Sequence, residues 1–163
     1  MSARSFRTKP ILIAGLAALA VAGLGATMTE LGPWYRSLQK PSWQPPEWLF
    51  GPAWTVIFAL GALSAARAWR DAPSREAREW IIGLFALNGF LNVSWTMLFF
   101  RIKRPDCALM EVGFLWLSIL VLIVFLGRFS RPASALLLPY LAWVTFAAVL
   151  NWRIVQLNAP FGG

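Results

Sequence analysis

Long apolar runs separated by short polar segments organise this chain of 163 residues. A helix crosses the roughly 30 Å hydrocarbon core of a bilayer with about 20 residues, and four of the charge-free runs reach that length. The run over 112–127 is shorter, and beginning its helix at Pro105, which suits the first helical position, brings Asp106 and Glu111 into the span. The pattern predicts an all-α integral membrane bundle of five transmembrane helices in a single domain over 1–163, with spans at about 10–29, 48–68, 80–100, 105–127 and 132–153.

The connections between the predicted helices are short with one exception. Short links make consecutive helices lie antiparallel. The link over 30–47 is longer than connections in compact domains usually are when they have no role of their own. It contains Pro41, Pro45 and Pro46, and because proline fixes its own φ and restricts the residue before it, the segment should be stiff. We expect it to act as a lid, with Trp43 and Trp48 as its anchors.

The first apolar run follows several basic residues, as the apolar part of a secretory signal peptide would. It is longer than the usual 7 to about 15 residues of such a segment, and four more spans follow, so we expect a retained helix. Small residues recur on it at four-residue steps, which lets another backbone approach closely. Either packing inside the bundle or a homodimer seam explains this face, which is made by Ala14, Ala18, Ala22 and Ala26 beside Gly15 and Gly23.

Composition supports the membrane assignment. Hydrophobic residues make up 58% of the chain and charged residues 13%, whereas a soluble domain has about 25% charged residues. The net charge of +8 comes from short clusters of Lys and Arg between the apolar runs, which favours helix flanks in a bilayer over a nucleic-acid surface. A modest excess of these residues on the N-terminal side favours a cytoplasmic N-terminus.

Several kinds of site are excluded by residues that the chain lacks. It has one cysteine, Cys107, and no histidine. An intramolecular disulfide and a Cys-based metal site both need more cysteines. Without imidazole there is no His-ligated haem and no Ser-His or Cys-His nucleophile pair. We therefore expect no metal site and no covalent cofactor.

Aromatic and carboxamide side chains recur at helical spacing in three predicted spans. Polar groups within a span usually face the bundle interior, so these stripes should converge. They would either bond the helices together or line a ligand pocket, and the spacing leaves both open. An aromatic cavity with a few carboxamides suits a flat hydrophobic ligand such as a tetrapyrrole, a sterol or an aromatic drug. The stripes are Phe50, Trp54 and Phe58; Asn88, Asn92 and Trp95; and Trp143, Ala147 and Asn151.

Three motifs occur in order along the chain: WYRSLQKPSWQPPEWLFGPAW at 34–54, LNVSWTMLFF at 91–100 and LLLPYLAWVTFAAVLN at 136–151. In these the sequence resembles the TspO/MBR family, the bacterial tryptophan-rich sensory proteins and the mitochondrial translocator protein. The resemblance implies a five-helix bundle, commonly a homodimer in a bacterial cell membrane, inner or outer, that binds porphyrins such as protoporphyrin IX, benzodiazepine-type drugs and, in animal members, cholesterol. It implies a role as receptor or regulator in porphyrin transport, sensing or stress response.

The resemblance also implies the ligand-binding residues. Taken over position by position, with Phe58 added from its stripe, they are Tyr35, Pro45, Trp54, Phe58, Asn92, Trp95, Cys107, Glu111, Trp143, Ala147 and Leu150. Glu111 stands where relatives often have aspartate, and Cys107 where animal members have tryptophan. The cholesterol motif of animal members has a tyrosine where this chain has Trp152, so we do not expect tight sterol binding.

Two other functions remain open. Some bacterial relatives are reported to break down porphyrin in light and oxygen, which would make Trp54 and Trp143 the candidate catalytic residues of an enzyme. A small proton-coupled transporter of aromatic compounds is the other alternative, with Glu111 as its coupling carboxylate. An odd number of spans and no repeated half argue against a transporter.

Overall fold

The computed structural model describes residues 3–161, with side chains described from Lys9 onward. Five segments of this part of the chain are long and apolar enough to cross a membrane, which confirms the predicted all-α bundle of five transmembrane helices. The elements, in chain order, are α1 (Ala3–Met28), α2 (Pro33–Ser37), the 3-10 turn η1 (Glu47–Leu49), α3 (Phe50–Asp71), α4 (Arg75–Thr96), the π-helical segment η2 (Met97–Arg101), α5 (Pro105–Gly127), α6 (Arg131–Ala135) and α7 (Leu138–Asn158).

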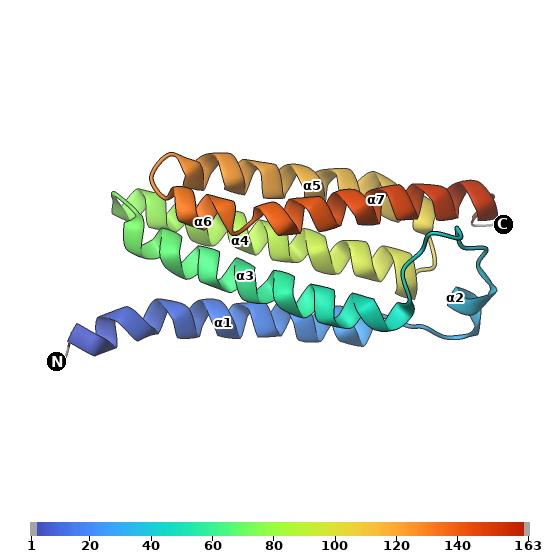
Figure 1. The fold of residues 1–163 in the computed structure, drawn as a ribbon, viewed down its shortest axis with the longest axis horizontal. Coiled ribbons are helices and arrows are strands. Elements are labelled where there is room, and N and C mark those ends of the chain that lie inside the picture. The colour runs from blue at the N-terminus through green and yellow to red at the C-terminus, as the bar shows by residue number, and fades with distance from the viewer. Residues whose placement is uncertain (1–2, 162–163) are drawn as a thin grey trace.

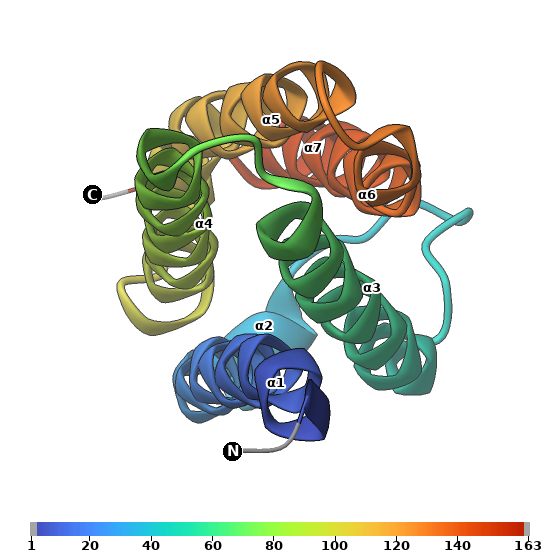
Figure 2. The same cartoon turned by 90° about the vertical axis from the view of Figure 1, so that its left-hand side faces the viewer.

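The long helices run side by side along one axis (Figure 1). Viewed along that axis, they form a ring in the order α1, α3, α7, α5 and α4 (Figure 2). Helix α1 packs on α3 and α4, and α5 packs on α4 and α7, whereas α3 rests on α6 and contacts α7 only sparingly. The loop that carries α2 lies at the end of the bundle opposite the N-terminus, beside the end of α7 (Figure 1). The expected lid is therefore at one mouth of the ring.

The last span is not one continuous helix. It consists of α6 and α7, with a turn between Ala135 and Leu138, and α7 continues to Asn158. Pro139 explains the break, because proline has no N–H to bond to the preceding turn and its ring clashes with that turn's carbonyl.

Elsewhere the helices reach beyond the charge-free runs. Helix α4 begins after Ser74, whose hydroxyl accepts a hydrogen bond from the N–H of Ala77 at 3.1 Å.

The buried core follows α5. Leu115, Ile119, Leu122 and Leu126 recur at three- and four-residue steps on this helix and are almost completely buried. Helix α1 is the opposite case, since none of its described side chains in the span Lys9–Met28 is buried.

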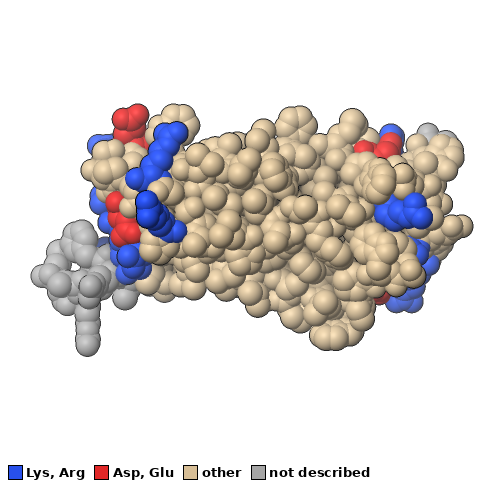
Figure 3. Space-filling model, turned by 45° about the horizontal axis from the view of Figure 1, so that its top comes forward, with Lys and Arg blue, Asp and Glu red and all other residues tan. Residues whose placement is uncertain are grey.

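Charged side chains gather at the two ends of the molecule and leave a broad uncharged band between them (Figure 3). This band matches the hydrocarbon layer that the spans must cross.

Candidate ligand-binding cavity

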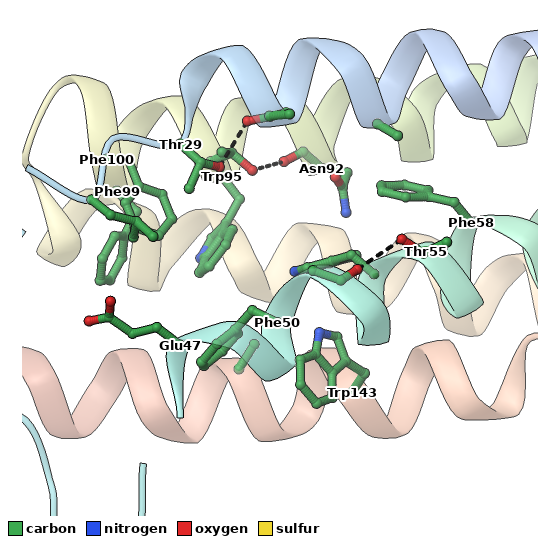
Figure 4. Close-up of a pocket in the computed structure, with 18 of the residues that line it drawn as sticks. Thr29, Glu47, Phe50, Thr55, Phe58, Asn92, Trp95, Phe99, Phe100 and Trp143 are labelled. Atoms are coloured by element: carbon green, nitrogen blue, oxygen red, sulfur yellow. Dashed lines mark hydrogen bonds between the residues drawn. The ribbon is translucent and has the colours of Figure 1, made fainter. Parts of the chain in front are cut away.

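A cavity of ≈ 880 Å³ lies inside the ring, between α1, α3, α4 with η2, and α7. Figure 4 shows the aromatic side chains that point into it. The cavity extends to the end of the bundle where the long loop lies, since residues of α2 and η1 also line it. Its walls are largely apolar, with a small number of hydroxyl and carboxamide groups. Cavities of this size and character bind small organic molecules in other proteins.

The structure brings most of the predicted site residues together. Eight of them line the cavity: Tyr35, Trp54, Phe58, Asn92, Trp95, Trp143, Ala147 and Leu150. Pro45, Cys107 and Glu111 lie outside the lining. For Cys107 and Glu111 the reason is the position of α5, which lies behind α4 and α7 in the ring and contributes no lining residue.

Two groups of aromatic rings make the walls of the cavity. On one side, Trp54 stacks on Phe58 with centroids 5.5 Å apart and meets Trp143 edge to face at 6.4 Å. These contacts follow from the four-residue spacing of Trp54 and Phe58 on α3 and from the seam between α3 and α7. On the other side, Trp95 of α4 packs against Phe99 of η2 at 5.5 Å. Rings from three spans thus face one space.

The carboxamides both bond the helices and border the cavity. Asn88 donates to the hydroxyl of Ser118 at 2.9 Å and lies away from the cavity, so its role is to join α4 to α5. Asn92 donates to the phenol oxygen of Tyr140 at 3.0 Å and also lines the cavity. Of the two interpretations that the spacing left open, interhelical bonding describes Asn88, and Asn92 fits both.

The indole N–H of Trp143 is a buried donor without a partner among the described residues. Its nitrogen points toward the side of the cavity where Phe50, Thr55 and Phe58 lie (Figure 4). A buried N–H of this kind costs free energy unless it is hydrogen-bonded. The nitrogen itself has almost no accessible surface, so a ligand oxygen in the cavity would satisfy it only if the indole ring turned toward the cavity.

The long loop is tied to the end of α7 and is held together by contacts of its own. Asn158 at the end of α7 accepts from the backbone N–H of Gln39 at 2.7 Å and donates to the backbone carbonyl of Gln39 at 2.8 Å. Within the loop, the side-chain amide of Gln44 donates to the phenol oxygen of Tyr35 at 3.3 Å, and the ammonium of Lys40 lies 3.9 Å from the centroid of the Tyr35 ring. Burial, with a smaller contribution from the charge of Glu47, raises the pKa of Tyr35, so the phenol stays protonated.

The anchors of the loop differ from the prediction in part. Trp43 packs edge to face on Phe146 of α7 with centroids 5.9 Å apart, as an anchor should. Trp48 is 71% exposed and borders the mouth of the cavity instead.

Sequence reasoning missed α1 as a wall of the cavity. Its small residues were interpreted as a packing face, but most of them border the empty space, which is lined from α1 by Gly15, Ala18, Leu19, Ala22, Gly25 and Ala26. The signal was the stripe of small residues itself, because a small side chain leaves room for a ligand as readily as for a helix. Phe100 and Glu47 at the mouth were also missed.

Fold and site together define a multi-pass helical membrane protein built around an internal aromatic cavity that opens beneath a loop. The sequence profile of the TspO/MBR family matches residues 12–157, and the chain belongs to this family. Among its relatives, the tryptophan-rich protein TspO of Chlorobaculum tepidum is 39% identical over 86% of this chain and 90% of its own length.

Two further relatives connect this chain to sensory and translocator proteins. The tryptophan-rich sensory protein of Cereibacter sphaeroides is 35% identical over 86% of this chain and 88% of its own length. The translocator protein of Bos taurus is 33% identical over 77% of this chain and 75% of its own length. The family membership supports the role of an integral membrane receptor or regulator.

Proposed function

We propose that this protein is a membrane receptor or regulator that binds tetrapyrroles, such as protoporphyrin IX, in the cavity between α1, α3, α4 and α7. The observation that carries the proposal is the convergence of Trp54, Trp95 and Trp143 from three different spans on one space of ≈ 880 Å³. Indole rings offer flat apolar surfaces, and a tetrapyrrole macrocycle is flat and apolar over most of its area.

The polar features of the cavity fit the edge of such a ligand. Asn92 lines the cavity with a carboxamide, and the N–H of Trp143, which has no partner among the described residues, would become a donor if its ring turned toward the ligand. The carboxylates of a porphyrin would stay at the loop end of the cavity, near Lys40 and Arg101, which lie outside the cavity lining, whereas the carboxylate of Glu47 lies within it. Lys40 already pairs with Glu47 at 3.1 Å, and Arg101 pairs with Glu30 at 3.6 Å. Each cation would therefore have to leave its acidic partner or bind the partner and the porphyrin carboxylate together.

Titration with protoporphyrin IX tests the proposal. The purified protein in detergent micelles should show saturable quenching of tryptophan fluorescence with one porphyrin per chain, because several rings lie at the cavity wall. A linear, non-saturating decrease equal to that of a helical membrane protein without such a cavity would contradict it. Other flat hydrophobic molecules, including benzodiazepine-type drugs and sterols, would then be ranked by competition with the bound porphyrin.

The wider role of the protein rests on the same binding event. We infer that the protein acts as a homodimer in a bacterial cell membrane. Porphyrin binding in the cavity would serve porphyrin transport, sensing or a stress response. Light scattering of the purified protein with and without porphyrin tests the dimer, since a monomer at all concentrations would contradict it.

A second candidate function is light- and oxygen-dependent degradation of the bound porphyrin. The observation that favours it is the pair Trp54 and Trp143, whose rings lie 6.4 Å apart and both border the cavity, next to any photosensitiser bound there. Enzymatic turnover predicts repeated loss of porphyrin absorbance per protein in light. Bleaching that stops after one equivalent, and that persists when both tryptophans are replaced by phenylalanine, would exclude the enzyme.

A further inference from the structure

A second hollow lies on the outside of the bundle, along the seam between α3 and α7. It has a volume of ≈ 570 Å³ and is lined by Leu49, Ala53 and Ile57 on one side and by Ala142, Trp143 and Phe146 on the other. The groove exists because α3 rests mainly on α6 and contacts α7 only sparingly, and because the facing positions Ala53 and Ala142 are small.

The groove lies within two membrane spans and faces the lipid, except at its loop end, where Trp43 packs on Phe146. Its residues belong to the spans Glu47–Asp71 and Arg131–Asn158, and Val56 at its edge is 58% exposed. From Leu49 to Ile57 a helix rises about 12 Å, which is close to the depth of one leaflet, about half of a 30 Å hydrocarbon core. An aliphatic chain of one leaflet therefore fits the groove in length and polarity.

A cation stands on the same face of α7, toward the loop end. Ala142, Phe146 and Arg153 follow one another at helical spacing, and Arg153 comes two turns after Phe146. Its guanidinium donates to the side-chain oxygen of Gln156 at 2.9 Å, and among the described side chains no carboxylate pairs with it. At this level of the bundle, charged residues return after the uncharged band, as expected for the lipid headgroup region (Figure 3).

We propose that the groove between α3 and α7 binds one acyl chain of an anionic phospholipid, whose phosphate group is held by Arg153. The apolar walls take the chain, and the exposed guanidinium offers several N–H donors to the phosphate oxygens. Trp143 lies between this groove and the internal cavity, since it lines both. The lipid would thus pack against the ring that also faces the cavity.

Native mass spectrometry tests the lipid site without any porphyrin. The full-length protein is reconstituted into nanodiscs of phosphatidylglycerol and phosphatidylcholine with identical acyl chains and then released into the gas phase. We expect the wild type to retain one phosphatidylglycerol. Ala142→Trp and Ala53→Trp should lose it, because each fills the groove from one wall, whereas Ala86→Trp on the lipid-facing side of α4 should keep it.

The charge is tested separately from the groove. Arg153→Gln should lower the preference for phosphatidylglycerol over phosphatidylcholine by roughly fivefold, and Arg36→Gln, an exposed arginine at the same end of the molecule, should not. Equal retention in Ala142→Trp, Ala53→Trp and Ala86→Trp, or no retained lipid in the wild type, would overturn the proposal. Neither Ala53 nor Ala142 lines the internal cavity, so this result is independent of the proposed function.

Discussion

The indole rings of Trp54 on α3 and Trp143 on α7 meet edge to face, with their centroids 6.4 Å apart and their planes at 86°. The two rings differ in their other contacts. Trp54 also stacks on Phe58 of its own helix, whereas Trp143 carries a buried N–H that no described residue accepts. Both rings therefore offer the cavity an apolar surface, and the N–H of Trp143 becomes a hydrogen-bond donor for a ligand only if the ring turns toward the cavity.

Replacing Trp143 with phenylalanine should weaken protoporphyrin IX binding by about five- to tenfold, because the change removes ring area at the cavity wall and a donor that could bond the ligand once the ring turns, a hydrogen bond worth about 1–1.5 kcal/mol. Fluorescence titration measures this effect, and Trp54→Phe should also weaken binding through lost ring area. Trp80→Phe is the control, since Trp80 is 56% exposed and lies outside the cavity. Unchanged porphyrin affinity in both cavity variants would show that the cavity is not the binding site.

Asn158→Ala should increase the rate of porphyrin release by about tenfold. The change removes both hydrogen bonds that tie the loop to α7, each worth roughly 0.5–1.5 kcal/mol, so the loop opens more often. Stopped-flow displacement of bound porphyrin measures the rate. Gln39→Ala is a matched control, because Asn158 contacts only the backbone of Gln39, and this variant should release porphyrin at the wild-type rate. Equal rates in both variants would show that the loop is not a lid.

Glu111→Leu should raise the thermal stability of the protein. Both carboxyl oxygens of Glu111 are buried without a hydrogen-bond partner in the described part of the chain, and an unpaired buried polar group costs about 1–3 kcal/mol in protein mutational data. Glu79→Leu is the control, since Glu79 is exposed and pairs with Arg75. A lower melting temperature for Glu111→Leu than for Glu79→Leu would mean that Glu111 has a partner in the membrane.

The same residue distinguishes the transporter alternative. Because Glu111 does not line the cavity, Glu111→Gln should leave porphyrin affinity unchanged. A proton-coupled transporter with Glu111 as its coupling carboxylate would instead lose uptake driven by a pH gradient in liposomes containing this variant. Normal uptake in such liposomes would exclude that role for Glu111.

Gly89→Ala should be less stable than Gly83→Ala, although both replace a glycine in α4. In a helix interior, alanine is more stabilising than glycine by up to about 1 kcal/mol. At Gly83 a Cβ atom would meet no atom within 4 Å, but at Gly89 it would lie 3.0 Å from a methyl group of Val21 on α1. The clash offsets the gain, and the double variant Gly89→Ala with Val21→Ala should recover it. Thermal unfolding in detergent measures the stability of all three variants. Equal melting temperatures would show that α1 moves away from the new methyl group without a loss of stability.

Much of the candidate site could be predicted from helical spacing. Phe50, Trp54 and Phe58 share one face of their helix by their four-residue steps, and this face points into the cavity. The fold class was equally accessible, because the length and polarity of the apolar runs are set by the thickness of the bilayer. The break between α6 and α7 could have been found as well, since Pro139 cannot continue a helix that began at Arg131.

The sequence by itself thus determined the number of spans and the faces that carry rings and carboxamides, because both depend on local periodicity and on the bilayer. Only the tertiary structure decided which of those faces meet. It placed α5 behind the cavity, so that Glu111 and Cys107 do not line it, and it placed the small residues of α1 along the cavity. It also left a lipid-facing groove between α3 and α7. These features depend on the order of helices around the ring, which lateral packing between distant segments decides.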